Sequence, residues 1–111
     1  GFWKHIQMRH NAIAVIVECK NHSSPVDAKD CTLAAKYLGK HRLGNFLLLI
    51  SRQAPSASAV KEVRRLWTAE EKLILLLNDD HLFEMIKLKS ASEEPELVLE
   101  NEYRSLFQSM E

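Results

Sequence analysis

The most informative stretch for the fold is Ala12-Ile13-Ala14-Val15-Ile16-Val17-Glu18-Cys19-Lys20. It is an apolar run that ends in two charged residues, Glu18 and Lys20. The run is rich in β-branched side chains, and unbroken apolar runs of this kind are typical of strands buried on both faces of a sheet. We therefore expect a buried strand over residues 12–19. A carboxylate placed directly after so many apolar residues is costly to bury unless it is paired or bound to a ligand.

A helix is predicted after the turn formed by residues 21–25, beginning at Asp27 or an adjacent residue and ending at Gly39 or Gly44. Its apolar residues recur at steps of three and four, which gives a stripe facing the core. The members of this stripe are Ala28, Cys31, Ala34, Ala35 and Leu38.

Two more apolar runs, residues 46–50 and 73–77, are predicted to be buried strands. Ser56 or Ser58 is expected to begin a helix between them, and Asp79 or Asp80 a short helix after the second run. A polar linker over residues 90–95 precedes a last amphipathic helix. Its stripe consists of Leu99, Tyr103, Leu106 and Met110. Apolar strands that alternate with helices indicate an α/β fold with a largely parallel sheet covered on both faces.

The charge of the chain is zero overall but is segregated along the sequence. Residues 1–67 hold eleven Lys and Arg against four Asp and Glu, and residues 68–111 hold four against eleven. A basic first part suits a polyanionic partner. The alternative is that the fold interleaves the two parts, so that no basic patch survives.

Several classes of protein are excluded by the composition. The apolar runs are far shorter than the roughly 18 residues that cross a bilayer, and no signal-peptide pattern is present. Cys19 and Cys31 do not have a metal-ligand spacing and are too few for a disulfide scaffold, so both are expected to be buried free thiols. A cytoplasmic protein with no membrane partner is expected.

Glu18 and Lys20 are the strongest candidates for chemistry. Side chains alternate along a strand, so these two should lie on one face, within a few ångströms of each other. Ligand sites in open α/β sheets gather at the carboxyl ends of strands. A carboxylate there can hold Mg²⁺, and a lysine two residues on can help deprotonate a water or stabilise a phosphorane-like transition state. The alternative is a salt bridge at the end of a strand.

The segment Ile16-Val17-Glu18-Cys19-Lys20-Asn21 resembles the catalytic strand of the PD-(D/E)xK, or restriction-endonuclease-like, nucleases. The run from Val15 to Ile50 resembles the bacterial branch of that superfamily, with a Ser/Pro turn, a helix and an apolar strand that ends in Ser51-Arg52. The resemblance covers most of residues 12–90. It implies a restriction-endonuclease-like core and a metal-dependent DNA endonuclease in a bacterial restriction, repair or defence protein.

By that resemblance Glu18 is a metal ligand for Mg²⁺ or Mn²⁺, the backbone carbonyl of Cys19 a second ligand, and Lys20 the catalytic lysine. The first motif of the family is an Asp on a preceding strand, and residues 1–17 contain neither Asp nor Glu. Either that Asp lies upstream of Gly1 or the nuclease is degenerate. Because Gly1-Phe2-Trp3 is an implausible natural start, we expect residues 1–111 to be an N-terminally truncated domain with a core over residues 12–90.

Other residues are candidates for contact with nucleic acid. Asn21 and His22 adjoin the motif, and Arg52 should lie at the same sheet edge as Glu18. Lys61, Arg64 and Arg65 form a basic helix face that could follow a phosphate backbone, although a solvated face fits as well.

Two other functions compete with the nuclease. One is a catalytically inactive nuclease-like module that binds nucleic acid or a protein partner. The other is an assembly domain that forms a homodimer or binds a partner through its C-terminal helix, which an exposed apolar stripe on that helix would favour.

Overall fold

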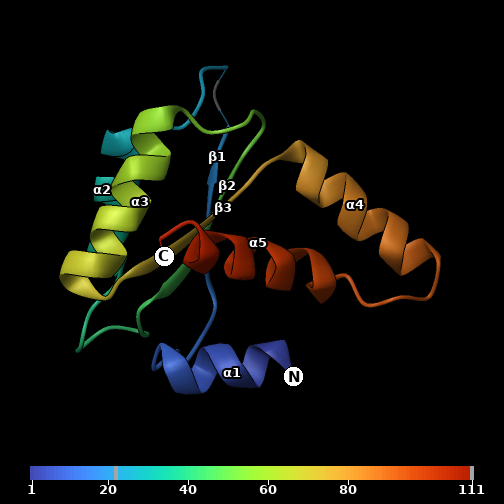
Figure 1. Cartoon of the computed structure of the whole chain (residues 1–111), viewed down its shortest axis with the longest axis horizontal. Helices are drawn as coiled ribbons and strands as arrows, with labels where there is room; N and C mark the ends of the chain where they lie inside the picture. The colour runs from blue at the N-terminus through green and yellow to red at the C-terminus, as the bar shows by residue number, and fades with distance from the viewer. Residues whose placement is uncertain (22, 111) are drawn as a thin grey trace.

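The computed structural model describes residues 1–21 and 23–110 and contains a three-stranded parallel sheet with helices on both faces (Figure 1). The strands are β1 (Ile16–Lys20), β2 (Phe46–Ser51) and β3 (Leu73–Leu77), in the order β1-β2-β3. The helices, in chain order, are α1 (Phe2–Arg9), α2 (Ala28–Ala34) with the 3-10 turn η1 (Ala35–Tyr37), α3 (Ala57–Glu70), α4 (Asp79–Ser90) and α5 (Glu96–Gln108). The predicted α/β class and the parallel sheet are confirmed.

The register brings the carboxyl ends of the three strands to one edge of the sheet. Lys20 lies opposite Ser51, and Ile50 lies opposite Leu77. The same edge therefore carries the end of β1, the loop after β2 and the start of α4.

Two apolar cores lie on the two faces of the sheet. Helices α2 and α3 cover one face, where the largest fully buried side chains are Cys31, Leu47, Leu49, Val63, Leu66 and Ile74. Helices α1 and α5 contribute to the other face, whose fully buried members include Ile6, Phe46, Leu73 and Leu75. Leu99 of α5 is 2% exposed, and Tyr103 and Leu106 pack against the same core. The apolar stripe of α5 is thus directed toward the sheet of its own chain.

Strand β1 differs from the prediction of a strand buried on both faces. It lies at the edge of the sheet and pairs only with β2. Val17 is 51% exposed and Cys19 is also exposed, whereas Ile16, Glu18 and Lys20 are half-buried. The predictions that β1 is buried on both faces and that Cys19 is buried were wrong, because β1 is an edge strand and α5 packs over β2 and β3 rather than over β1. The predicted burial of Cys31 is confirmed.

Strand β1 is also shorter than its apolar run. Residues 12–15 form a connection in which the Ile13 amide donates to the Leu43 carbonyl at 2.8 Å. Ile16 lies opposite Leu47, so of the preceding residues only Val15 could face a residue of β2, and residues 12–14 have no neighbouring strand to pair with. Hydrophobicity alone could not show where β1 begins, because the ends of a strand depend on its partner strand.

The helix starts follow local side-chain chemistry. Asp27 caps α2 by accepting from the Asp30 amide at 3.1 Å, and Ser56 caps α3 by accepting from the Ala59 amide at 3.2 Å. The cap of α4 is Asn78, which accepts from the Asp80 amide at 2.9 Å, so the prediction of Asp79 or Asp80 was wrong by one or two positions. Helix α1 was not predicted, because Ile6 is its only buried residue and leaves little periodic signal.

Candidate functional site

Glu18 and Lys20 lie on the same face of β1, as their spacing predicts. Lys20 Nζ is 3.0 Å from Glu18 Oε1, and the two side chains are 25% and 21% exposed. They share this face with Ile16, which packs against the core beneath α2 and α3. The pair is therefore sheltered on one side by helix α2 and open toward the edge of the sheet.

The charge of Lys20 is stabilised by its neighbours. The hydrogen bond to Glu18 and the charge of that carboxylate raise the pKa of Lys20, and the nearby Asp30 and Tyr37 act in the same direction. Lys20 is thus a cation at neutral pH. A fixed cation at this position can bind a phosphate oxygen, whereas a lysine that removes a proton from water needs a lowered pKa.

The second oxygen of Glu18 is the unusual feature of the site. Glu18 Oε2 is buried and has no hydrogen-bond partner among the described residues. Buried carboxylate oxygens are normally paired, and leaving one without a partner costs free energy. This oxygen can accept a hydrogen bond from a ligand or coordinate a hard cation such as Mg²⁺, which prefers oxygen ligands.

The groups that could serve as ligands for a divalent cation here are the Glu18 carboxylate and the neighbouring backbone carbonyl. Cys19 points to the opposite face of β1, so only its carbonyl could add to a site that Glu18 begins. Within residues 1–21 and 23–110, His, Cys, Asp and Glu side chains form no cluster of three that could hold a metal ion. A cation bound at Glu18 would then take its other ligands from water and from the oxygens of a substrate.

Arg52 lies at the same edge of the sheet. It follows Ser51, the residue opposite Lys20, and its side chain is 71% exposed. Its Nε is 3.9 Å from Asp79 Oδ2, a loose ion pair across the start of α4. Asn21 is exposed and directly follows Lys20. His22, the other candidate in this turn, lies outside the described residues.

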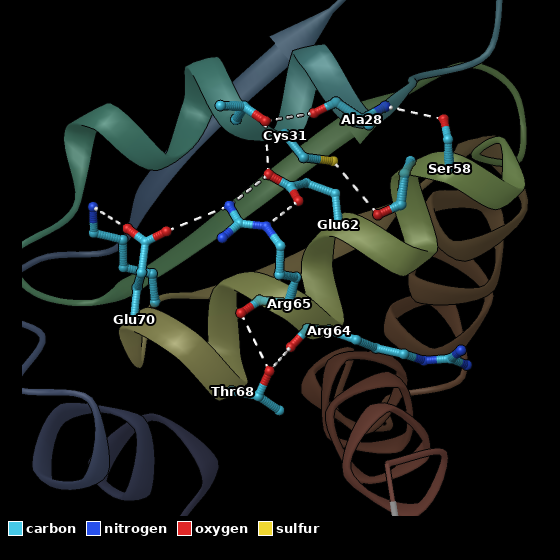
Figure 2. A network of polar contacts seen from close by, with 11 residues as sticks. Ala28, Cys31, Ser58, Glu62, Arg64, Arg65, Thr68 and Glu70 are labelled. Carbon is cyan, nitrogen blue, oxygen red and sulfur yellow. Dashed lines mark hydrogen bonds and ion pairs between the residues drawn. The ribbon is translucent and has the colours of Figure 1, made fainter.

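The side chains of Arg64 and Arg65 on α3 extend in different directions (Figure 2). Arg65 donates to Glu62 at 2.6 Å and 2.9 Å and also contacts Glu70 at 3.4 Å. Arg64 extends the other way, toward α5, where its Nε donates to Ser109 Oγ at 3.3 Å. Lys61 is exposed one turn earlier. The structure brings Arg52 to the edge that carries Glu18 and Lys20, but it leaves Arg64 and Arg65 engaged with other partners.

Asp30 and Tyr37 are neighbours of Lys20 that the sequence analysis did not connect with the site. Both raise the pKa of Lys20, and both belong to the helical segment that covers the Lys20 face of β1. Asp30 carries a sequence signal only for the cap of α2, since its carboxylate accepts from the Asp27 amide at 3.0 Å. Its position beside Lys20 depends on how α2 packs on the sheet, which no local pattern encodes.

Comparisons of the chain with protein-family models, with curated proteins and with solved structures find no match. Among the described residues, none of the helices has the length and apolar character needed to cross a membrane.

Proposed function

We propose that this chain belongs to a PD-(D/E)xK-type, metal-dependent DNA endonuclease that hydrolyses phosphodiester bonds in a bacterial restriction, repair or defence protein. The main support for the proposal is the way in which the two carboxylate oxygens of Glu18 are contacted at the carboxyl end of β1. One of its oxygens lies 3.0 Å from Lys20 Nζ, and the other is buried with no hydrogen-bond partner in the part of the chain that the structure describes. A half-satisfied carboxylate beside a cation suits a site that binds both a metal ion and a phosphate.

In this proposal the Glu18 carboxylate and the carbonyl of Cys19 would hold Mg²⁺ or Mn²⁺. When bound, the metal ion would supply Lewis-acid activation of water and would neutralise charge on the phosphate. Lys20, held as a cation, orients the phosphate and stabilises the negative charge that builds up on its oxygens during hydrolysis. Asp30 and Tyr37 help to keep Lys20 charged.

The family pattern also includes an Asp from a preceding strand, and residues 1–17 provide no carboxylate. One side-chain carboxylate holds Mg²⁺ poorly. We therefore expect the 111-residue chain to cleave DNA slowly when it is tested by itself. Robust cleavage by this chain alone would mean that the site lies elsewhere.

A non-catalytic module that binds nucleic acid or a protein partner is the second candidate. The ion pair between Glu18 and Lys20 favours this non-catalytic function, because the two side chains already neutralise each other without a metal ion. In that case the two residues only stabilise the end of β1. The two candidates differ in whether Lys20 affects a chemical step.

Replacement of Lys20 in the protein that carries this chain separates these candidates. Lys20→Met should lower the cleavage rate by about 100-fold or more and leave the affinity for duplex DNA nearly unchanged, since its role is in the transition state. Lys89→Met, at an exposed lysine of α4, is the matched control and should cut at the normal rate. Normal cleavage by Lys20→Met would refute the nuclease assignment of this site. Absence of cleavage by the wild-type protein with Mg²⁺ or Mn²⁺ would favour the non-catalytic module.

A further inference from the structure

A second basic surface lies away from Glu18, on η1 and the segment that connects η1 to β2. We call it the basic loop and define it by Lys36, Lys40, His41 and Arg42, all of which are exposed. Two large side chains are exposed among them: Tyr37 is 56% exposed and Leu43 is 49% exposed. Cations interleaved with an aromatic residue are typical of surfaces that bind nucleic acids.

The charge of the basic loop is not neutralised by side chains in the described part of the chain. Residues 31–61 contain no Asp or Glu, and no acidic side chain of the described residues forms an ion pair with Lys36, Lys40 or Arg42. Arg65, by contrast, is held by Glu62 and Glu70. The basic loop is therefore better placed than the end of α3 to attract a polyanion.

The backbone of this loop is held in one shape. The Gly39 amide donates to the Gly44 carbonyl at 3.3 Å, and the Arg42 amide donates to the Gly39 carbonyl at 3.1 Å. The Leu43 carbonyl accepts from the Ile13 amide at 2.8 Å, which ties the loop to the connection before β1. The cationic side chains thus project from a turn that backbone hydrogen bonds hold in place. Because the backbone is already ordered, less conformational entropy is lost when they bind a ligand.

The basic loop precedes β2 and so lies at the amino ends of the strands, whereas Lys20 lies at the carboxyl end of β1. Helix α2 and η1 run from the end of β1 toward the loop, and Tyr37 of η1 lies close enough to Lys20 to raise its pKa. Ser51 lies opposite Lys20, seven residues beyond Gly44. At about 3.3 Å for each strand residue, Lys20 and the end of the loop are separated by about 23 Å along the sheet.

We propose that the basic loop binds the phosphate backbone of duplex DNA as a second contact beside the Glu18–Lys20 site. A separation of about 23 Å equals the rise of about seven base pairs, so one duplex can reach both surfaces. The distance between the DNA contact of the loop and the cleaved phosphodiester bond rests on the proposed nuclease function. The binding itself does not, since it needs neither Glu18 nor a metal ion.

The test uses the 111-residue chain with both loop charges removed, Lys40→Gln with Arg42→Gln. The matched control is Lys87→Gln with Lys89→Gln, which removes two exposed charges from α4. Fluorescence anisotropy with a labelled 20-base-pair duplex would be measured at several salt concentrations between about 50 and 200 mM. Far-UV circular dichroism would check that each variant is folded.

Loss of two phosphate contacts should lower the affinity roughly tenfold and reduce the slope of log affinity against log salt by about two. The α4 control should bind like the wild type. Equal affinity of the loop variant and the wild type would overturn the inference while leaving the cleavage assay on Lys20 intact. A wild-type chain that binds phosphatidylserine vesicles but no duplex would overturn it in favour of a lipid surface. Loss of duplex binding in the loop variant, together with normal cleavage by Lys20→Met, would support the loop and refute the nuclease site.

Discussion

The hydroxyl of Tyr103 on α5 lies 2.7 Å from Nε2 of His10, which follows α1, and 3.2 Å from Nε2 of His5. His10 is 2% exposed, and its ring packs against Phe46 and Trp67. Burial lowers the pKa of His10 to about 4, and the positive charge of Arg9 adds to the effect. The hydrogen bond that joins α5 to the end of α1 is therefore made by a neutral imidazole at pH 7.

This buried histidine should make the stability of the domain depend on pH. The pKa of His10 is about 4 in the folded chain and 6.5 in the unfolded chain, so between these values only the unfolded chain binds the proton. The free energy of unfolding should fall by about 3 kcal/mol as the pH drops from 6.5 to 4, and no further loss from His10 follows below that. Urea titrations across this range should show the loss, and His10→Gln should remove it. His41→Gln, in the exposed loop, should keep it; a variant at His10 with an unchanged pH profile would contradict the assignment.

Gly44 should tolerate no side chain. A Cβ there would lie 2.5 Å from the Asn11 carbonyl oxygen and 2.6 Å from Ala12 Cα, and the residue has a φ of +124°. Gly44→Ala should cost about 3 kcal/mol or more, because both the contact and the backbone angle are unfavourable. Gly39→Ala is the control: its φ is +148°, but its Cβ would meet only Arg42 Cγ at 3.7 Å. Thermal melting should show a clearly larger loss for Gly44→Ala, and equal losses would argue against close packing at Gly44.

The two thiols should differ strongly in reactivity. Cys31 is fully buried, and its pKa is raised to about 12, first by burial and then by the charges of Asp30 and Glu62. Cys19 lies exposed on the open face of β1. The thiolate is the reactive form, so N-ethylmaleimide should label Cys19 within minutes and Cys31 only after unfolding. Mass spectrometry of native and urea-treated protein would measure this, and fast labelling of native Cys31 would contradict the packing of α2.

The cap of α2 should contribute measurably to stability. Asp27 and Asp30 form a reciprocal capping box, in which each carboxylate accepts from the other's backbone amide. Asp27→Ala should lower the free energy of unfolding by about 1 kcal/mol. Lys29→Ala, at an exposed position of the same helix, should change it by less than about 0.5 kcal/mol. Chemical denaturation of the two variants gives the comparison, and a larger effect at Lys29 would refute the capping role.

Local patterns in the sequence predicted those features that depend on near neighbours in the chain. The apolar runs at residues 46–50 and 73–77 form strands, and Asp27 and Ser56 begin helices, because hydrophobic periodicity and capping act over a few residues. The close approach of Glu18 and Lys20 was predictable for the same reason, since residues two apart in a strand share a face.

Other features were decided only by the tertiary structure. Val17 is exposed because β1 has a partner strand on one side and no helix over its other face. Arg64 and Arg65 point in different directions because Ser109 and Glu62 attract them from separate elements. Local sequence patterns were enough to predict the three strands, the helices after β1 and the Glu18–Lys20 pair, but not helix α1. Only the packing of distant segments decided which charges are neutralised and which oxygen of Glu18 has no hydrogen-bond partner among the described residues, because burial and ion pairing depend on contacts that no local pattern contains.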